Sequence, residues 1–105
     1  MIVQSAKAQN QVRIDSLLNA LNQSHDTAKV WVWMELSAEY HSFNPNKAIQ
    51  YGEKALHLAQ KLDYRQGIGR SLHYIGTAYR AKLDFTRSRK YFFLSLPFMK
   101  KSAIL

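Results

Sequence analysis

One pattern of large and small side chains occurs twice in this 105-residue chain. The offset between the copies is thirty-nine positions from Tyr40 to Tyr79 and forty positions from Ala48 to Ser88. A fixed period of this length is typical of stacked helical hairpins, in which each unit buries its apolar face against the next. The first copy comprises Trp33, Leu36, Ser37, Tyr40, Ala48, Gly52, Ala55 and Leu56. The second copy comprises Leu72, Ile75, Gly76, Tyr79, Ser88, Phe92, Ser95 and Leu96.

The spacing of apolar residues predicts about five helices, and no segment alternates long enough to predict a strand. The predicted domain covers 10–98, with a leading helix 10–22, repeat one 28–62 and repeat two 66–98, between tails at 1–9 and 99–105. The predicted helix caps are Asn44, Asp84 and either Asp26 or Thr27, and proline suits the position after Asn44. In the leading helix the expected buried stripe is Val12, Leu17, Leu18 and Leu21, with Ile14 at its margin.

Several chemistries have no support in the sequence. The chain has no cysteine, which excludes disulfides and thiolate zinc sites. Successive histidines are sixteen positions apart, whereas metal-binding pairs on a helix are three or four positions apart. Gly67-Ile68-Gly69 lacks the third glycine of a nucleotide-binding loop. We therefore predict no catalytic residue, no metal and no cofactor, and the chain is not expected to be an enzyme.

The repeated residues resemble the tetratricopeptide repeat, whose pattern has an aromatic residue, leucine-glycine, tyrosine, alanine, an aromatic residue and alanine. The resemblance covers about residues 28–98. It implies an all-α fold in which antiparallel helix hairpins stack as a short right-handed superhelix. It also implies a non-catalytic module that binds a protein or peptide on its concave face.

A narrower resemblance involves residues 15–18, 26–30 and 44–48. They are similar to the N-terminal repeat regions of some bacterial sensor histidine kinases and repeat-bearing transcriptional regulators. Those proteins begin with a signal peptide, and Ala6-Lys7-Ala8 has the small residues of a cleavage site. The tail 1–9 is thus either a chance match or the remnant of a signal peptide. The sequence leaves the localisation unknown: we expect the cytoplasm if the sequence is taken as written and the periplasm if the N-terminus is a truncated signal peptide.

The tetratricopeptide register implies a peptide-binding groove formed by the first helix of each unit. Its cationic members, Arg70, His73 and Arg80, favour an acidic segment or a C-terminal carboxylate as the ligand. The alternative is that they are ordinary exposed polar residues. The implied groove residues are Trp31, Met34, Ala38 and His41 in the first copy, and Arg70, His73, Thr77 and Arg80 in the second.

Positive charge is concentrated in the second half of the chain. The net charge is +8, of which residues 66–105 carry eight basic groups and one acidic group. A cluster of this kind predicts either a solvated face or binding to nucleic acid or an anionic surface. The predicted basic patch consists of Arg80, Lys82, Arg87, Arg89 and Lys90.

The last predicted helix is apolar nearly all round, and after Leu96 the sequence no longer follows the repeat. An exposed apolar patch normally marks an interface. We therefore expect self-association or packing on a further repeat, as in a chain that is cut short. No apolar run is long enough to predict a transmembrane segment. The predicted hydrophobic interface consists of Tyr91, Phe93, Leu94 and Phe98.

Overall fold

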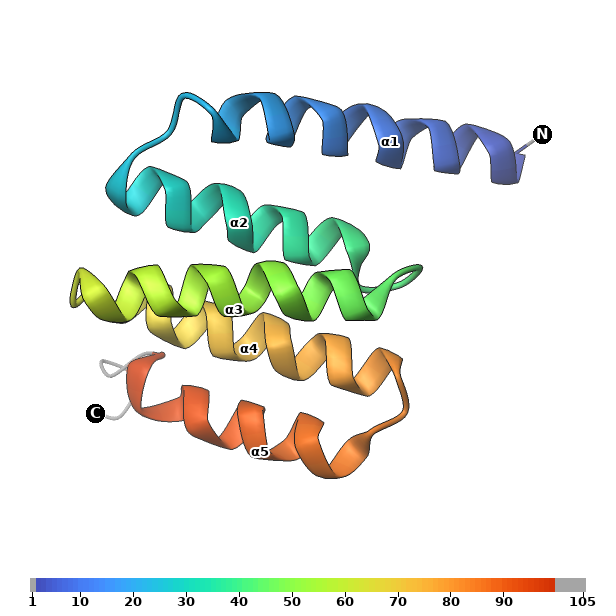
Figure 1. The fold of residues 1–105 in the computed structure, drawn as a ribbon. Coiled ribbons are helices and arrows are strands. Elements are labelled where there is room, and N and C mark those ends of the chain that lie inside the picture. Colours follow the sequence, from blue (N-terminus) through green and yellow to red (C-terminus); the bar gives the residue numbers. More distant parts are fainter. Residues whose placement is uncertain (1, 100–105) are drawn as a thin grey trace.

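Five α-helices and a final 3₁₀ turn form the fold (Figure 1). The structure, a computed structural model, describes the backbone of residues 2–99 and the side chains of residues 10–99. Within this range there is no strand. The prediction of an all-α fold with about five helices is confirmed. The elements are α1 (Ile2–Leu21), α2 (Asp26–Tyr40), α3 (Pro45–Lys61), α4 (Arg65–Ala81), α5 (Phe85–Ser95) and η1 (Leu96–Phe98).

Consecutive helices are antiparallel neighbours, and α4 contacts α2 as well as α3 and α5 (Figure 1). The hairpins α2–α3 and α4–α5 correspond to the two copies of the repeat. Because α3 runs opposite to both of its neighbours, α2 and α4 run in the same direction. Among the described residues, no helix has both the length and the hydrophobicity of a membrane span.

Short local signals determine where α3 and α5 begin. The Asn44 side chain accepts a hydrogen bond from the Lys47 N–H at 3.2 Å, and Pro45 occupies the first helical position. The Asp84 side chain accepts one from the Arg87 N–H at 3.1 Å. Each cap satisfies a backbone donor that the first turn of a helix leaves without a partner. The caps Asn44 and Asp84 are therefore confirmed. The prediction of Asp26 or Thr27 as a cap was wrong, because α2 begins at Asp26 and its N-cap position is His25, whose side chain forms no cap bond.

The same turn ends α3 and α4. The Tyr64 N–H donates to the Ala59 carbonyl at 2.8 Å, and the Asp84 N–H donates to the Tyr79 carbonyl at 2.9 Å. These are the long-range bonds of a Schellman turn, which requires a residue with positive φ. Asp63 (φ 56°) and Leu83 (φ 64°) occupy these positions. The turn after α3 joins the two copies, whereas the turn after α4 lies within the second copy. The equivalent turn of the first copy, between α2 and α3, has no described residue with positive φ, so the copies differ in this turn.

The core lies where α2, α3 and α4 meet, and small residues of α3 allow the close approach. The Ser37 hydroxyl donates to the Ala48 carbonyl at 2.8 Å, which joins α2 to α3 in the interior. A methyl group at Gly52 would lie 2.7 Å from Cγ1 of Ile75 on α4. The main buried cluster consists of Val30, Met34, Ala55, Ala59, Ile68 and Leu72.

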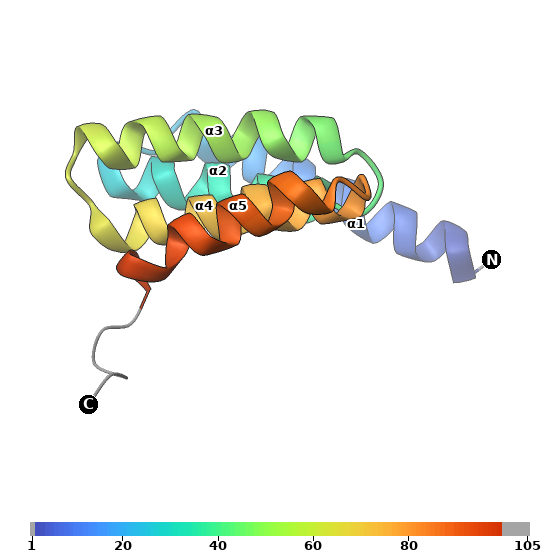
Figure 2. The same ribbon diagram turned by 90° about the horizontal axis from the view of Figure 1, so that it is seen from below.

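The prediction for the leading helix was wrong in two respects. Helix α1 begins at Ile2, so the backbone of residues 2–9, predicted as a tail, is helical. Ile14 is only 1% exposed, whereas Val12 is 68% and Leu18 36% exposed. The reason is that α1 packs mainly on α2, and its start extends beyond the other helices (Figure 2). The buried side is therefore narrow and centred on Ile14. Residues 100–105 of the predicted C-terminal tail lie outside the described residues.

Candidate binding surfaces

Trp31 and Arg70, two residues of the predicted groove, contact each other across α2 and α4. The Arg70 guanidinium lies 5.1 Å from the centroid of the Trp31 ring, at the distance of a cation–π contact. Trp31 Nε1 donates a hydrogen bond to the Tyr64 hydroxyl at 2.8 Å, which fixes the ring. One end of the face shared by α2 and α4 therefore presents a guanidinium held against an aromatic ring.

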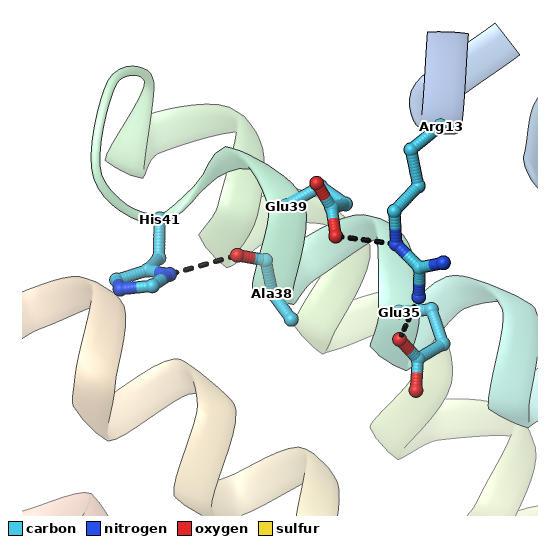
Figure 3. A network of polar contacts seen from close by, with 5 residues as sticks. All are labelled: Arg13, Glu35, Ala38, Glu39 and His41. Atoms are coloured by element: carbon cyan, nitrogen blue, oxygen red, sulfur yellow. Dashed lines mark hydrogen bonds and ion pairs between the residues drawn. The ribbon is translucent and has the colours of Figure 1, made fainter. Parts of the chain in front are cut away.

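The other end of this face has a cleft of about 320 Å³, lined by His41, Ser42, Thr77, Arg80 and Ala81. His41 Nδ1 lies 2.8 Å from the Ala38 carbonyl, which can only accept a hydrogen bond, so the Nδ1–H group is directed at the backbone (Figure 3). The Thr77 hydroxyl donates to the His73 carbonyl at 3.1 Å. Arg80 is consequently the strongest remaining donor in the cleft, and its guanidinium suits a carboxylate or a phosphate.

His73 lies on α4 between Arg70 and Arg80. Its ring is 5.1 Å from that of Phe92 on α5. Burial, and then the charges of Arg80 and Arg70, lower the pKa of His73. The imidazole is therefore neutral near pH 7, and it differs in charge from the two arginines beside it.

Met34 does not line the groove, contrary to the prediction. Its side chain is fully buried in the cluster that includes Ile68 and Leu72 of α4. Met34 and His73 occupy equivalent positions in the two copies of the repeat. Met34 is buried because α4 packs over α2. We define the α2–α4 face by the remaining groove residues: Trp31, Ala38, His41, Arg70, His73, Thr77 and Arg80.

Sequence analysis missed an ion-pair network that joins α1 to α2 (Figure 3). Arg13 donates from Nη2 to Glu35 at 2.8 Å and from Nε to Glu39 at 2.6 Å. Hydrogen bonds to Glu39 and Glu35 raise the pKa of Arg13. The two carboxylates of α2 thus point toward α1. The spacing of Glu35 and Glu39 by four residues places them on one helical face, but only the fold reveals their partner.

The five cations of the predicted basic patch are spread over several surfaces. Arg80 belongs to the α2–α4 face and lies over the Phe92 ring. Lys82 donates a hydrogen bond to Asn46 Oδ1 at 2.7 Å. Arg87 lies over the Tyr79 ring and Lys90 over the Tyr91 ring, and these two rings stack on each other. Arg87 also forms an ion pair with Asp84 at 3.4 Å. Arg89 lies on the exposed side of α5.

The four residues of the predicted hydrophobic interface do not form one patch. Tyr91 is half-buried and stacks on Tyr79. Phe98 is also half-buried, with the Arg65 guanidinium 4.8 Å above its ring. Phe93 (70% exposed) and Leu94 (44% exposed) are accessible but point in directions about 100° apart.

A different set of residues forms an exposed stripe along α5 and the first residue of η1. Phe85, Arg89, Phe93 and Leu96 follow one another at intervals of four, four and three residues, which places them on one helical face. Phe85 is 58% exposed and Leu96 is 63% exposed. We call these four residues the outer α5 stripe. Sequence analysis did not assign Phe85 to an interface, although its helical spacing from Phe93 was a usable signal.

Comparisons with known proteins include a partial match. The chain is 36% identical over 59 residues to Tetratricopeptide repeat protein 29 of Trypanosoma brucei brucei. The match covers 56% of this chain and 12% of that protein, so the chain spans a small part of this relative. The chain is tetratricopeptide-like. No model of a known protein family and no solved structure matches it.

The tetratricopeptide-like assignment rests on this match together with the repeated hairpins. The handedness of a superhelix and the similarity to bacterial signalling proteins stay predictions. Within residues 10–99, no group of three or more histidine, aspartate or glutamate side chains is arranged to hold a metal ion.

Proposed function

We propose that this chain is a non-catalytic interaction module that binds an acidic protein segment along the α2–α4 face. In a tetratricopeptide array this would be the concave face. The observation that carries the proposal concerns Arg70 and Arg80. They lie on one face of α4, and among the described residues neither forms an ion pair with a carboxylate. Two of the three acidic residues of α2, Glu35 and Glu39, are bound to Arg13.

The distance between the two arginines defines the ligand further. They are ten residues apart on α4, which corresponds to about 15 Å along a helix axis. An extended segment covers about 3.3 Å per residue, so four or five residues span this distance. The ring of Trp31 beside Arg70 and that of Phe92 beside Arg80 add apolar contact at both ends. The expected ligand carries two acidic groups about five residues apart, one of which can be a C-terminal carboxylate.

The proposal is tested with labelled synthetic peptides in which zero to seven residues separate two aspartates. Fluorescence anisotropy should show the highest affinity when about four residues lie between the two aspartates, which places the aspartates about five positions apart. The double variant Arg70→Glu, Arg80→Glu should weaken binding more than tenfold, because two charge-assisted contacts become repulsive. The matched control is Lys54→Glu, Lys61→Glu, which makes the same charge change at two exposed residues of α3.

Two results would contradict the proposal. One is an equal loss of affinity in both double variants, because binding would then follow net charge. The other is an affinity that does not depend on the separation of the aspartates.

A second candidate function is binding to nucleic acid or an anionic surface. It is supported by Arg87 and Lys90, which flank the stacked Tyr79 and Tyr91 rings, since cations beside aromatic rings suit single strands. A mobility-shift assay with single-stranded DNA at low and moderate salt tests it, and no shift at low salt rejects it. A role at the front of a bacterial signalling protein rests on the sequence resemblance alone.

A further inference from the structure

Only part of the outer α5 stripe has a covered counterpart in the first copy: the equivalent of Arg89 is the buried Ile49, whereas the equivalent of Phe93 is the exposed Glu53. Ile49 of α3 is buried in a cluster with Ala78 of α4. Gly52 of α3 approaches α4 so closely that a methyl group there would lie 2.7 Å from Cγ1 of Ile75. In the second copy, the equivalents of Ile49 and Gly52 are Arg89 and Phe92 on α5.

Arg89 determines what can cover this face. A helix packed on α5 as α4 packs on α3 would contact the half-buried Phe92 and cover Arg89. A helix displaced toward the exposed Phe93 would also contact Phe85 and Leu96 and would enclose Arg89 among them. A guanidinium taken out of water without a counter-ion is strongly unfavourable. The covering helix must therefore supply a carboxylate near Arg89 and apolar side chains on both sides of it.

A second copy of this chain does not meet this requirement through its own α5. Asp84 is the only acidic residue among residues 66–105. It already accepts the Arg87 N–H at 3.1 Å and lies 3.4 Å from the Arg87 guanidinium. Two α5 helices placed face to face would therefore bring Arg89 and its neighbouring cations together with no free carboxylate.

We propose that the outer α5 stripe binds an acidic amphipathic helix of another protein. Its apolar residues recur every three or four positions and contact Phe85, Phe93 and Leu96, and a glutamate or aspartate between them binds Arg89. The stripe extends from Phe85 to Leu96, or about 17 Å of helix, so the partner needs at least about three turns. This surface is separate from the α2–α4 face and does not depend on it.

The test uses a designed amphipathic peptide of about five helical turns with a leucine stripe flanked by glutamates, and the same peptide with lysine in place of every glutamate. Titration calorimetry should detect binding of the glutamate peptide only. Arg89→Glu should weaken that binding about tenfold, whereas Lys90→Glu, with the same charge change beside the stripe, should weaken it less than about threefold. Phe93→Ser should also weaken it about tenfold, and Leu94→Ser, on another side of α5, should have little effect. Far-UV circular dichroism confirms that each variant is folded.

Three results would overturn the proposal. The first is equal weakening by Arg89→Glu and Lys90→Glu. The second is a loss of binding in the Arg70→Glu, Arg80→Glu variant, because the peptide would then occupy the α2–α4 face. The third is a dimer of the free chain in sedimentation equilibrium that Phe93→Ser dissociates, because the stripe would then be covered by a second copy. Failure of this test leaves the peptide-spacing experiment on the α2–α4 face unaffected.

Discussion

Replacement of Gly52 by alanine tests the close packing of the first repeat on α4. Two opposing effects operate at this position. Alanine in a helix interior is favoured over glycine by about 1 kcal/mol, because glycine loses more backbone entropy on folding. The added methyl group, however, would lie 2.7 Å from Cγ1 of Ile75 and 3.4 Å from Oγ of Ser37. The sign of the change in stability depends on whether Ile75 can move.

Ile75 has little freedom to move. Its side chain is fully buried, and the contacting atom is the Cγ1 methylene, directly bonded to the branched Cβ, rather than a flexible end. Overpacking of a core costs about 1–3 kcal/mol. After the helix-propensity gain is subtracted, Gly52→Ala should lower the free energy of unfolding by about 1 kcal/mol.

A double-mutant cycle with Ile75→Ala isolates the contact. Ile75→Ala alone should cost about 2–5 kcal/mol, because it empties a buried site. In that background the methyl group at position 52 no longer meets Cγ1, so Gly52→Ala should stabilise the protein by about 1 kcal/mol. The expected coupling between the two sites is therefore about 2 kcal/mol, within the range found for residues in contact. Urea denaturation followed by far-UV circular dichroism measures all four proteins.

The exposed residue Gln50 on the same helix provides the control. The difference in stability between Gln50→Ala and Gln50→Gly gives the alanine–glycine term for α3 without any core contact. If Gly52→Ala stabilised the otherwise unchanged protein by that full difference, α3 and α4 would not approach each other at this point. The same result would remove the packing geometry on which the outer α5 stripe is compared with α3.

Three further predictions concern the turn, the histidine and α1. Leu83→Gly should raise the free energy of unfolding by about 0.5–1 kcal/mol, because leucine is strained at φ 64° and glycine is not. Urea denaturation measures this change, and the absence of a gain would contradict the turn geometry. Because the pKa of His73 is lowered in the folded chain, the unfolded chain binds the proton more tightly. The contribution of His73 to the free energy of unfolding is therefore complete above about pH 6.5 and falls below it. His73→Gln should flatten the curve of stability against pH below that point, and an unchanged slope would contradict this. Arg13→Ala should increase amide hydrogen exchange in residues 10–21 more than in α4, and added salt at about 0.5 M should have the smaller effect on the variant.

The parts of the fold that the sequence predicted depend on local or periodic signals. Asn44-Pro45 and Asp84 specify helix starts through hydrogen bonds within three residues, so they can be recognised without the fold. The repeat in turn specifies which hairpins stack, because equivalent residues must meet equivalent neighbours.

The missed features depend on contacts between distant segments. The direction from which α2 approaches α1 decides that Ile14 is buried and Val12 is not, and the period of an amphipathic helix alone does not give that direction. The bonds from Arg13 to Glu35 and Glu39 join residues 22 and 26 positions apart. For the same reason the dense cations of residues 80–90 look like one patch in the sequence, whereas α4 and α5 direct them to different surfaces.

A comparison of equivalent positions links the two proposed surfaces. In the first copy, Met34 and Ile49 are both apolar and both buried in clusters that include residues of α4. Their equivalents in the second copy are His73 and Arg89, which are ionisable and exposed. A third unit with the apolar character of α4 would have to bury both of them, and desolvation would oppose this. Acidic ligands would not carry this desolvation cost, because a carboxylate on the α2–α4 face favours the protonated form of His73 and a carboxylate on the outer α5 stripe pairs with Arg89. Both positions therefore support the proposed acidic partners over the packing of another apolar repeat.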